Sequence, residues 1–190
     1  EPQFLKVNAG SFIFYKNTQF IAPASWRPIA KYVQQITNTS INTLQKGNTR
    51  IIFKENKKLA ASEYTLEVTT NTVTITANDY AGALYGAQTI VQLWYTSSTP
   101  SRIACVTVKD KPRFEYRGLM LDVSRNFYPV SFIKSLIDVL SIYKINNLHL
   151  HLTDGAGWRL EIKKYPLLTK QAAFRTHKTW KEWWKNGMGY

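Results

Sequence analysis

The chain has 190 residues, of which 44% are hydrophobic, and this predicts one domain or two small ones with an ordinary core. Its formal net charge of +13 is spread evenly, with 13 basic and 7 acidic residues over 1–116 and 12 basic and 5 acidic residues over 117–190. This even spread favours a solvated cationic surface and argues against nucleic-acid binding. No apolar run reaches 18 residues, so we expect no membrane span, and no signal peptide is visible in this sequence.

The first part of the chain predicts an α+β domain, an antiparallel sheet with helices on one face. The expected strands are short and alternate in polarity, at 4–7, 12–15, 50–54, 64–68, 73–75 and 103–108. A helix is expected over 25–35 with Ser25 as its cap, and another from Asp79, an N-cap residue, to about Tyr95. The single Cys105 cannot form an intramolecular disulfide and is expected to be a small buried hydrophobe.

The stretch that follows predicts a parallel strand–helix–strand unit. Leu119 to Val123 suits a buried strand, Pro129 ends the loop after it, and apolar residues at helical spacing follow. A second strand runs from Asn147 to Leu152. Both strands end in polar residues, and the carboxyl ends of parallel strands are where barrel and open-sheet enzymes keep their chemistry.

Three motifs in this stretch carry a resemblance, namely RGLMLDVSR, HLHLTDGAGWR and EIKKYP, in that order. They resemble the start of the catalytic barrel in glycoside hydrolase family 20, the β-N-acetylhexosaminidases. The similarity is close over 117–176 and weaker over 64–93. It implies two domains, 1–114 as the α+β domain that precedes the barrel and 115–190 as the first part of a (β/α)8 TIM barrel.

The same resemblance indicates an incomplete catalytic domain. A (β/α)8 barrel needs about 250 residues, and the family's signature ends in an Asp-Glu pair that occurs nowhere in this sequence. We therefore expect no catalytic residue in this chain, an inactive fragment on its own, and the remainder of the barrel as its partner.

For the intact protein the resemblance implies a retaining exo-β-N-acetylhexosaminidase. Its substrate would be an oligosaccharide or glycoconjugate that ends in an N-acetylhexosamine, GlcNAc or GalNAc. Family 20 uses the substrate's own acetamido oxygen as nucleophile, through an oxazolinium ring, in place of a second carboxylate. No metal and no organic cofactor is implied, and the expected location is the periplasm, the cell envelope or outside the cell.

Site residues follow from the same comparison. Arg117 would bind the hydroxyls at the far edge of the sugar, and a salt bridge with Glu115 is the structural alternative. Asp154 would support the active site, pairing with a histidine from a later strand; a simple turn aspartate before Gly155 is the alternative. Gly155 replaces the second aspartate that is frequent in the family. His151 is the other support residue.

Two other classes of function remain open. His149 and His151 point to one face of their strand and could bind a metal, as in amidohydrolase-like barrels, although His177 is the one further histidine. Packed, hydrogen-bonded histidines are the favoured interpretation. The chain could also be a non-catalytic glycan-binding or interface module, but an open barrel edge would promote aggregation.

Two further groups have both a structural and a functional interpretation. Asp122 and Arg125 are expected to form a local ion pair that supports the first barrel strand. Trp180, Trp183 and Trp184 belong either to a loop helix packed on the barrel or to an aromatic wall beside a sugar.

Overall fold

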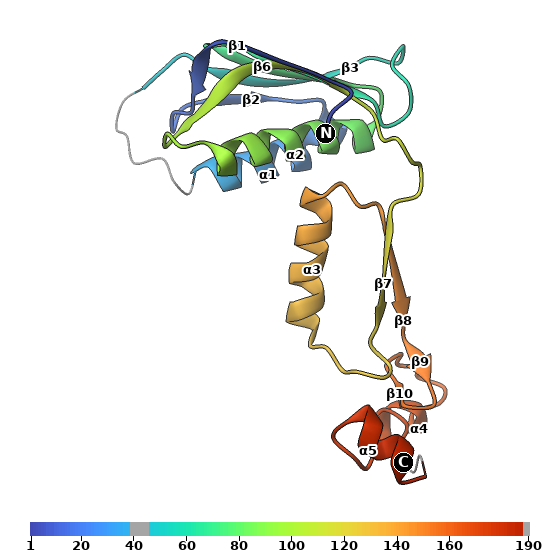
Figure 1. The fold of residues 1–190 in the computed structure, drawn as a ribbon. Helices are drawn as coiled ribbons and strands as arrows, with labels where there is room; N and C mark the ends of the chain where they lie inside the picture. Colours follow the sequence, from blue (N-terminus) through green and yellow to red (C-terminus); the bar gives the residue numbers. More distant parts are fainter. Residues whose placement is uncertain (39–45, 188–190) are drawn as a thin grey trace. The chain divides into compact units, whose positions relative to one another are not determined.

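The computed structural model divides the chain into two units, Glu1–Glu115 and Tyr116–Tyr190, and describes residues 1–38 and 46–187 (Figure 1). The first unit contains β1 (Phe4–Ile13), β2 (Gln19–Ile21), a 3-10 turn (Ala24–Trp26), α1 (Arg27–Asn38), β3 (Arg50–Glu55), β4 (Tyr64–Val68), β5 (Thr72–Ala77), α2 (Tyr80–Thr96) and β6 (Arg102–Asp110). The second contains β7 (Gly118–Asp122), α3 (Val130–Ile142), β8 (Asn147–His151), β9 (Thr153–Asp154), β10 (Gly157–Trp158), α4 (Leu167–Lys170) and α5 (Trp180–Lys185).

A six-stranded sheet in the order β1-β6-β4-β5-β3-β2 forms the first unit. The pairs β1–β6, β6–β4 and β4–β5 are antiparallel, whereas β5–β3 and β3–β2 are parallel. The sheet is therefore mixed, and the prediction of an antiparallel sheet was wrong in this respect. The reason is the connection through α1: a helical crossover returns the chain to the end of the sheet from which it left, so β3 runs parallel to β2.

The first strand is longer than the sequence pattern indicated. We expected two edge strands at 4–7 and 12–15, but β1 is one strand that pairs with β6 along its length. Its register shifts between Val7 and Ser11, and Gly10 lies there with φ +94°. A glycine in this left-handed conformation allows a β-bulge, which interrupts the alternation of side chains without ending the strand.

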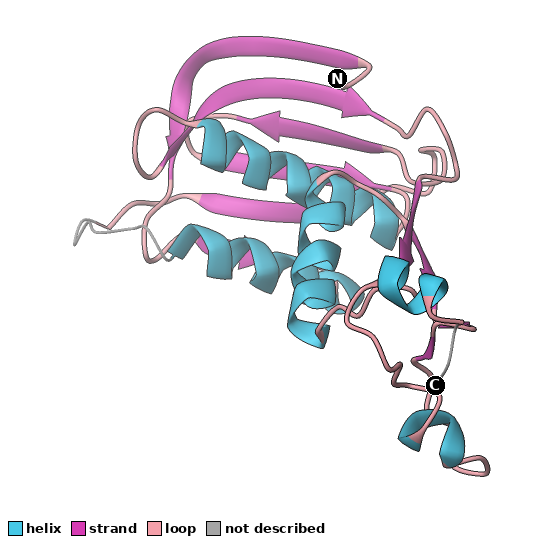
Figure 2. Ribbon diagram, turned by 60° about the horizontal axis from the view of Figure 1, so that its bottom comes forward, coloured by secondary structure: helices cyan, strands magenta, loops and turns pink. Residues whose placement is uncertain are grey.

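Both helices of this unit cover the same face of the sheet, as predicted (Figures 1 and 2). Every second residue of β4 and β5 is buried beneath them: Tyr64, Leu66, Val68, Val73, Ile75 and Ala77. The Asp79 carboxylate accepts a hydrogen bond from the Gly82 N–H at 2.8 Å, which confirms the predicted N-cap of α2. The chain enters α1 through a 3-10 turn capped at Pro23, so Ser25 is not the cap.

The second unit begins with the predicted strand–helix–strand unit. β7 and β8 pair in parallel, with Asp122 opposite His151 at their carboxyl ends, and α3 connects them. Within the described residues no side chain of α3 is buried, and several large apolar groups of β7 and α3 are exposed: Leu119, Met120, Phe132, Ile137 and Val139. The (β/α)8 barrel beyond this unit stays a prediction.

Gly82 allows α2 to approach the sheet, and we expect Gly82→Ala to destabilise the first unit. A Cβ atom there would lie 2.5 Å from the Glu63 carbonyl oxygen, a backbone atom that cannot rotate away. Overpacking of this kind costs up to about 3 kcal/mol, more than the roughly 1 kcal/mol of helix propensity gained. Thermal unfolding should show a lower midpoint for Gly82→Ala than for the control Tyr95→Ala, whose side chain is exposed. Equal midpoints would contradict the close approach.

Candidate functional site

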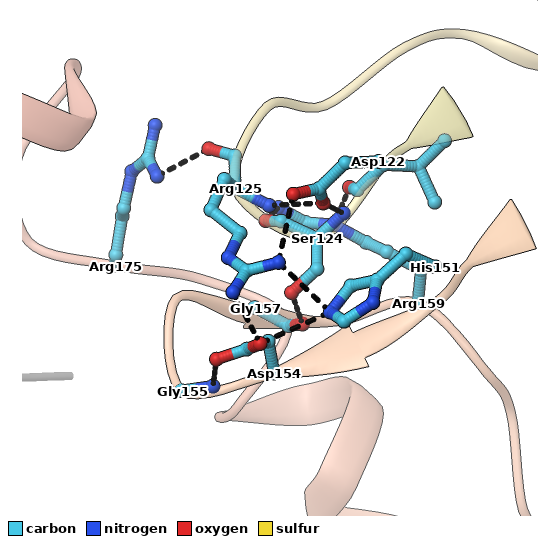
Figure 3. Close-up of polar contacts among 10 residues, drawn as sticks. Asp122, Ser124, Arg125, His151, Asp154, Gly155, Gly157, Arg159 and Arg175 are labelled. Atoms are coloured by element: carbon cyan, nitrogen blue, oxygen red, sulfur yellow. Dashed lines mark hydrogen bonds and ion pairs between the residues drawn. The ribbon is translucent and has the colours of Figure 1, made fainter. Parts of the chain in front are cut away.

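Polar side chains gather where β7 and β8 end (Figure 3). The parallel register places Asp122 beside His151, and β9 begins two residues after β8, which brings Asp154 to the same end. Arg125 follows in the loop after β7. These four residues, Asp122, Arg125, His151 and Asp154, form what we call the strand-end cluster.

Asp122 organises the loop that follows β7. One carboxylate oxygen, Oδ1, accepts the N–H groups of Ser124 at 2.9 Å and Arg125 at 3.0 Å. The other, Oδ2, accepts Nη1 of Arg125 at 2.9 Å, so the predicted local ion pair is confirmed. Burial opposes ionisation, but the hydrogen bonds and positive charge from Arg125, with the Ser124 N–H, hold the pKa of Asp122 below its usual value.

Arg125 also reaches the second strand, which the sequence did not indicate. Its Nη2 lies 2.8 Å from Oδ2 of Asp154, so one guanidinium joins the carboxylate at the end of β7 to a carboxylate of β9, just after β8. The Arg125 side chain is 36% exposed. A planar cation with five donors, held between two carboxylates and open to solvent, can present its remaining donors to the hydroxyl groups of a ligand.

Asp154 is exposed and remains ionised. Its Oδ1 accepts the Gly155 N–H and its Oδ2 faces both His151 and Arg125. The Gly155 hydrogen bond, followed by the contact with His151 and the charge of Arg125, lowers the pKa of Asp154. One carboxylate oxygen of Asp154 thus stabilises the turn at Gly155, and the other contacts His151 and Arg125 in the strand-end cluster. The role of Asp154 in an active site stays a prediction.

His151 stands between the other members of the cluster. Its Nε2 lies 3.0 Å from Nη1 of Arg125 and 3.0 Å from Oδ2 of Asp154. An unprotonated Nε2 accepts from Arg125, whereas a protonated Nε2 donates to Asp154, and one nitrogen cannot do both at once. The tautomer of the ring therefore determines whether Nε2 of His151 is hydrogen-bonded to Arg125 or to Asp154.

The structure does not bring Arg117 to this cluster. Arg117 precedes Gly118, the first residue of β7, whereas Asp154 and His151 lie at the carboxyl end of the strand pair. Five residues of strand separate the two ends by about 17 Å. The Arg117 Nε donates to the carbonyl of Lys144 at 2.8 Å, and its N–H donates to Asn146, so the residue ties β7 to the turn that leads into β8.

The remaining candidates have separate positions. His149 is exposed, because β7 and β8 form a two-stranded sheet whose faces are only partly covered, so it is not the packed residue that was expected. His151 is hydrogen-bonded, as expected, but its side chain is partly exposed. Within residues 1–38 and 46–187, no three His, Cys, Asp or Glu side chains lie close enough to hold a metal. Trp183 is 2% exposed, as expected of a packed helix, whereas Trp184 is 59% exposed.

Comparison with known proteins places both units in one family. Residues 1–111 match the family model for "Glycosyl hydrolase family 20, domain 2", and residues 114–189 match that for "Glycosyl hydrolase family 20, catalytic domain". The chain belongs to glycosyl hydrolase family 20. The resemblance carried by the three sequence motifs is therefore confirmed.

Relatives of this family 20 chain are enzymes by name. A beta-hexosaminidase of Vibrio furnissii is 38% identical over 129 residues, which are 68% of this chain and 21% of that protein. A beta-hexosaminidase of Porphyromonas gingivalis is 46% identical over 111 residues, 55% of this chain and 14% of that protein. The chain thus spans about a fifth or less of the length of these two relatives.

Solved structures show the same similarity. An exo beta-N-acetylglucosaminidase of Vibrio harveyi, in complex with N-acetylglucosamine, matches with a TM-score of 0.78 at 34% identity, over 90% of this chain and 28% of that one. A beta-N-acetylhexosaminidase of Bacteroides fragilis matches with a TM-score of 0.80 at 31% identity, over 91% of this chain and 36% of that one. In the described part of the family 20 chain, no helix is long and apolar enough to cross a membrane; its cellular location stays a prediction.

The ionised Asp122 should stabilise the second unit in a pH-dependent way. Its pKa is depressed on folding, so its contribution is present above the ordinary carboxyl pKa and is lost as the pH falls through the lower folded-state value. We expect Asp122→Asn to lose about 1 kcal/mol near neutral pH, or about 2–4 °C in melting temperature. The gap between parent and variant should close as the pH falls below about 4.

Melting temperatures measured from pH 7 to pH 2 test this expectation. The control is Asp138→Asn, which removes an exposed carboxylate from α3. A gap between the parent and Asp122→Asn that stays constant down to pH 2 would show that the charge of Asp122 does not stabilise the loop.

Proposed function

We propose that the whole protein containing this chain is a retaining exo-β-N-acetylhexosaminidase that removes terminal N-acetylhexosamine from glycans. The observation that carries the proposal is the strand-end cluster, in which one partly exposed guanidinium lies between two carboxylates within a family 20 catalytic domain. Barrel enzymes keep their active sites at the carboxyl ends of strands, which is where this cluster lies. The names of the relatives support the same activity.

The proposed reaction is substrate-assisted. The acetamido oxygen of the bound sugar attacks its own anomeric carbon and closes an oxazolinium ring, while a carboxylic acid protonates the leaving oxygen and later activates water. Because nucleophile and electrophile belong to one molecule, most of the entropy of bringing them together is already spent. This sequence holds no Asp-Glu pair, so we propose that the rest of the barrel supplies the acid/base and the group that holds the acetamido nitrogen.

Arg125, in place of Arg117, is the residue that we propose for binding the sugar. Arg125 lies at the carboxyl end of the strands with part of its guanidinium exposed, whereas Arg117 lies at the opposite end and donates to the Lys144 carbonyl. Neighbouring hydroxyls of a pyranose match the spacing of the donors on a planar guanidinium. Asp122 and Asp154 fix the plane of that guanidinium before the sugar arrives.

We propose Asp154 and His151 as support residues of the same site. Asp154 is ionised, and its Oδ2 faces the guanidinium and the imidazole together. A negative charge at this edge of the site can stabilise a cation beside it, such as a protonated imidazole. The Nε2 atom of His151 lies 3.0 Å from Oδ2 of Asp154, so the imidazole helps to hold that carboxylate in place.

The metal-dependent alternative is less well supported. A metal bound through Nε2 of His151 would lie close to the Arg125 cation, whose Nη1 is 3.0 Å from that nitrogen, and the two positive charges would repel each other. A non-catalytic interface module would need another protein to cover the exposed apolar residues of β7 and α3. We propose that the remaining elements of the same barrel cover them.

Hydrolysis of a chromogenic β-N-acetylglucosaminide tests the activity directly. We expect turnover by the whole protein, retention of the anomeric configuration in the first product, and no loss of rate after treatment with a chelator. A polypeptide of these 190 residues should show no turnover, because it lacks the Asp-Glu pair. A whole protein without turnover on β-linked GlcNAc and GalNAc would contradict the proposal, and a chelator-sensitive enzyme that depends on His149 would favour the metal alternative.

The two arginines should behave differently in the whole enzyme. Arg125→Ala loses charge-assisted hydrogen bonds to the sugar, which are worth about 1.5–3 kcal/mol, so kcat/KM should fall roughly ten- to a hundredfold. Arg117→Ala loses its contact with the Lys144 carbonyl and should lower the melting temperature, with kcat/KM close to that of the parent.

A deoxy substrate provides the matched control for this comparison. A substrate that lacks one of the bound hydroxyls should be poor for the parent, and that penalty should disappear in Arg125→Ala, because the hydrogen bond is already lost. Loss of activity in Arg117→Ala, together with a full deoxy penalty in Arg125→Ala, would return the sugar-binding role to Arg117.

A further inference from the structure

Three consecutive backbone carbonyls in the loop after β7 are held by guanidinium groups from a distant part of the chain. Arg159 donates from Nε to the carbonyl of Val123 at 3.0 Å and from Nη2 to that of Ser124 at 3.3 Å. Arg175 donates from Nη1 to the carbonyl of Arg125 at 2.6 Å (Figure 3). Each donor comes from a residue 35 to 50 positions further along the sequence.

Other contacts hold the same loop from its inner side. Ser124 is fully buried and its hydroxyl donates to the carbonyl of Gly157 at 2.6 Å. The Val123 N–H donates to the carbonyl of His151, and the Arg159 cation lies over the ring of Phe127 at 5.5 Å. The loop thus has little freedom to move relative to β8 and β10.

Gly157 makes room for this arrangement. A Cβ atom at residue 157 would lie 2.6 Å from Nη2 of Arg159 and 3.0 Å from the carbonyl oxygen of Ser124. The space that a larger residue would fill is therefore occupied by the guanidinium and the carbonyl that it binds.

The arrangement carries an electrostatic cost. Burial, followed by the nearby positive charge of Arg175, lowers the pKa of Arg159. Arg159 also donates to the carbonyl of Ala173, and Arg175 also donates to the carbonyls of His177 and Lys178. Two neighbouring cations are thus used to bind main-chain oxygens, which fixes the path of the backbone on both sides.

We infer that Arg159 and Arg175 are positioning residues that act through Arg125, an inference that rests on the sugar-binding role proposed above. The N–H of Arg125 is held by Asp122 and its carbonyl by Arg175, so its backbone is fixed from both sides. The side chain of Arg125 therefore starts from a fixed backbone position, from which it contacts His151 and Asp154. A sugar-binding group held in place before binding loses little freedom when the substrate arrives.

A double-mutant cycle in the whole enzyme tests this inference. We expect Arg175→Ala to lower kcat/KM about ten- to a hundredfold, since displacement by about 1 Å can cost that much. In an Arg125→Ala background the same change should have almost no further effect, because the residue through which it acts is gone. Arg175→Lys keeps the positive charge but lacks the planar set of guanidinium donors, so it should restore only part of the kcat/KM that Arg175→Ala loses.

Controls separate positioning from general stability. Lys170→Ala removes an exposed cation from the same segment and should match the parent in kcat/KM. Gly157→Ala displaces the Arg159 guanidinium without changing either arginine. It should lower kcat/KM as Arg175→Ala does, and it should have almost no effect on kcat/KM in the Arg125→Ala background. Equal fold losses with and without Arg125 would overturn the inference and leave Arg175 a purely structural residue.

A second measurement does not depend on activity. Backbone amides of Ser124 and Arg125 should exchange hydrogen for deuterium faster in Arg175→Ala than in the parent and in Lys170→Ala, because the loop opens more often. Unchanged exchange rates would show that Arg175 does not hold the loop in place. If the parent enzyme does not hydrolyse β-N-acetylhexosaminides, the proposed function fails and the role in sugar binding fails with it, while the exchange result still decides whether Arg175 holds the loop.

Discussion

The guanidinium of Arg125 between two carboxylates is the interaction on which the rest of the site depends. Asp122 is the last residue of β7 and Asp154 lies in β9, three residues after the end of β8, and without a cation between them their charges would repel. The guanidinium offsets this repulsion and sets the direction of both carboxylates. Because all three side chains are partly exposed, the ion pairs add little to stability by themselves. Their effect is on geometry, since each group has few other directions in which to point.

Much of this arrangement follows from features that are local in the sequence. Alternating apolar residues predicted the hairpin of β4 and β5, the Asp79 cap predicted the start of α2, and Pro129 predicted the start of α3. The ion pair between Asp122 and Arg125 was also predictable, because three residues in a tight loop bring such side chains together. These features depend on neighbours within a few positions, which a single sequence displays.

The sequence did not predict the parallel strands of the first unit or the contact between Arg125 and Asp154. Both depend on residues that are distant in the sequence and on the direction in which strands run. The parallel pairing of β3 with β2 and β5 depends on the path of the crossover through α1, and the polarity pattern of a strand does not record that path. Arg117 and Arg125 flank the same strand, β7, at its amino and carboxyl ends, and the motif alone does not indicate which of them lies beside Asp154. Contact between Arg125 and Asp154 depends on the parallel register of β7 and β8, which places Asp122 opposite His151.

The loop that carries Arg125 shows why a short motif is not sufficient to make a site. The motif supplies Asp122, Ser124 and Arg125, but the carbonyls from Val123 to Arg125 accept hydrogen bonds from Arg159 and Arg175. Without these donors, buried main-chain oxygens of the loop would be unpaired, at a cost of about 1–3 kcal/mol for each group. The loop would then adopt several conformations in place of one. The segment from Gly157 to Arg175 must therefore be in place before Arg125 has a single position. Sequence changes in that segment, although it contributes no group to the strand-end cluster, can alter the direction in which Arg125 points.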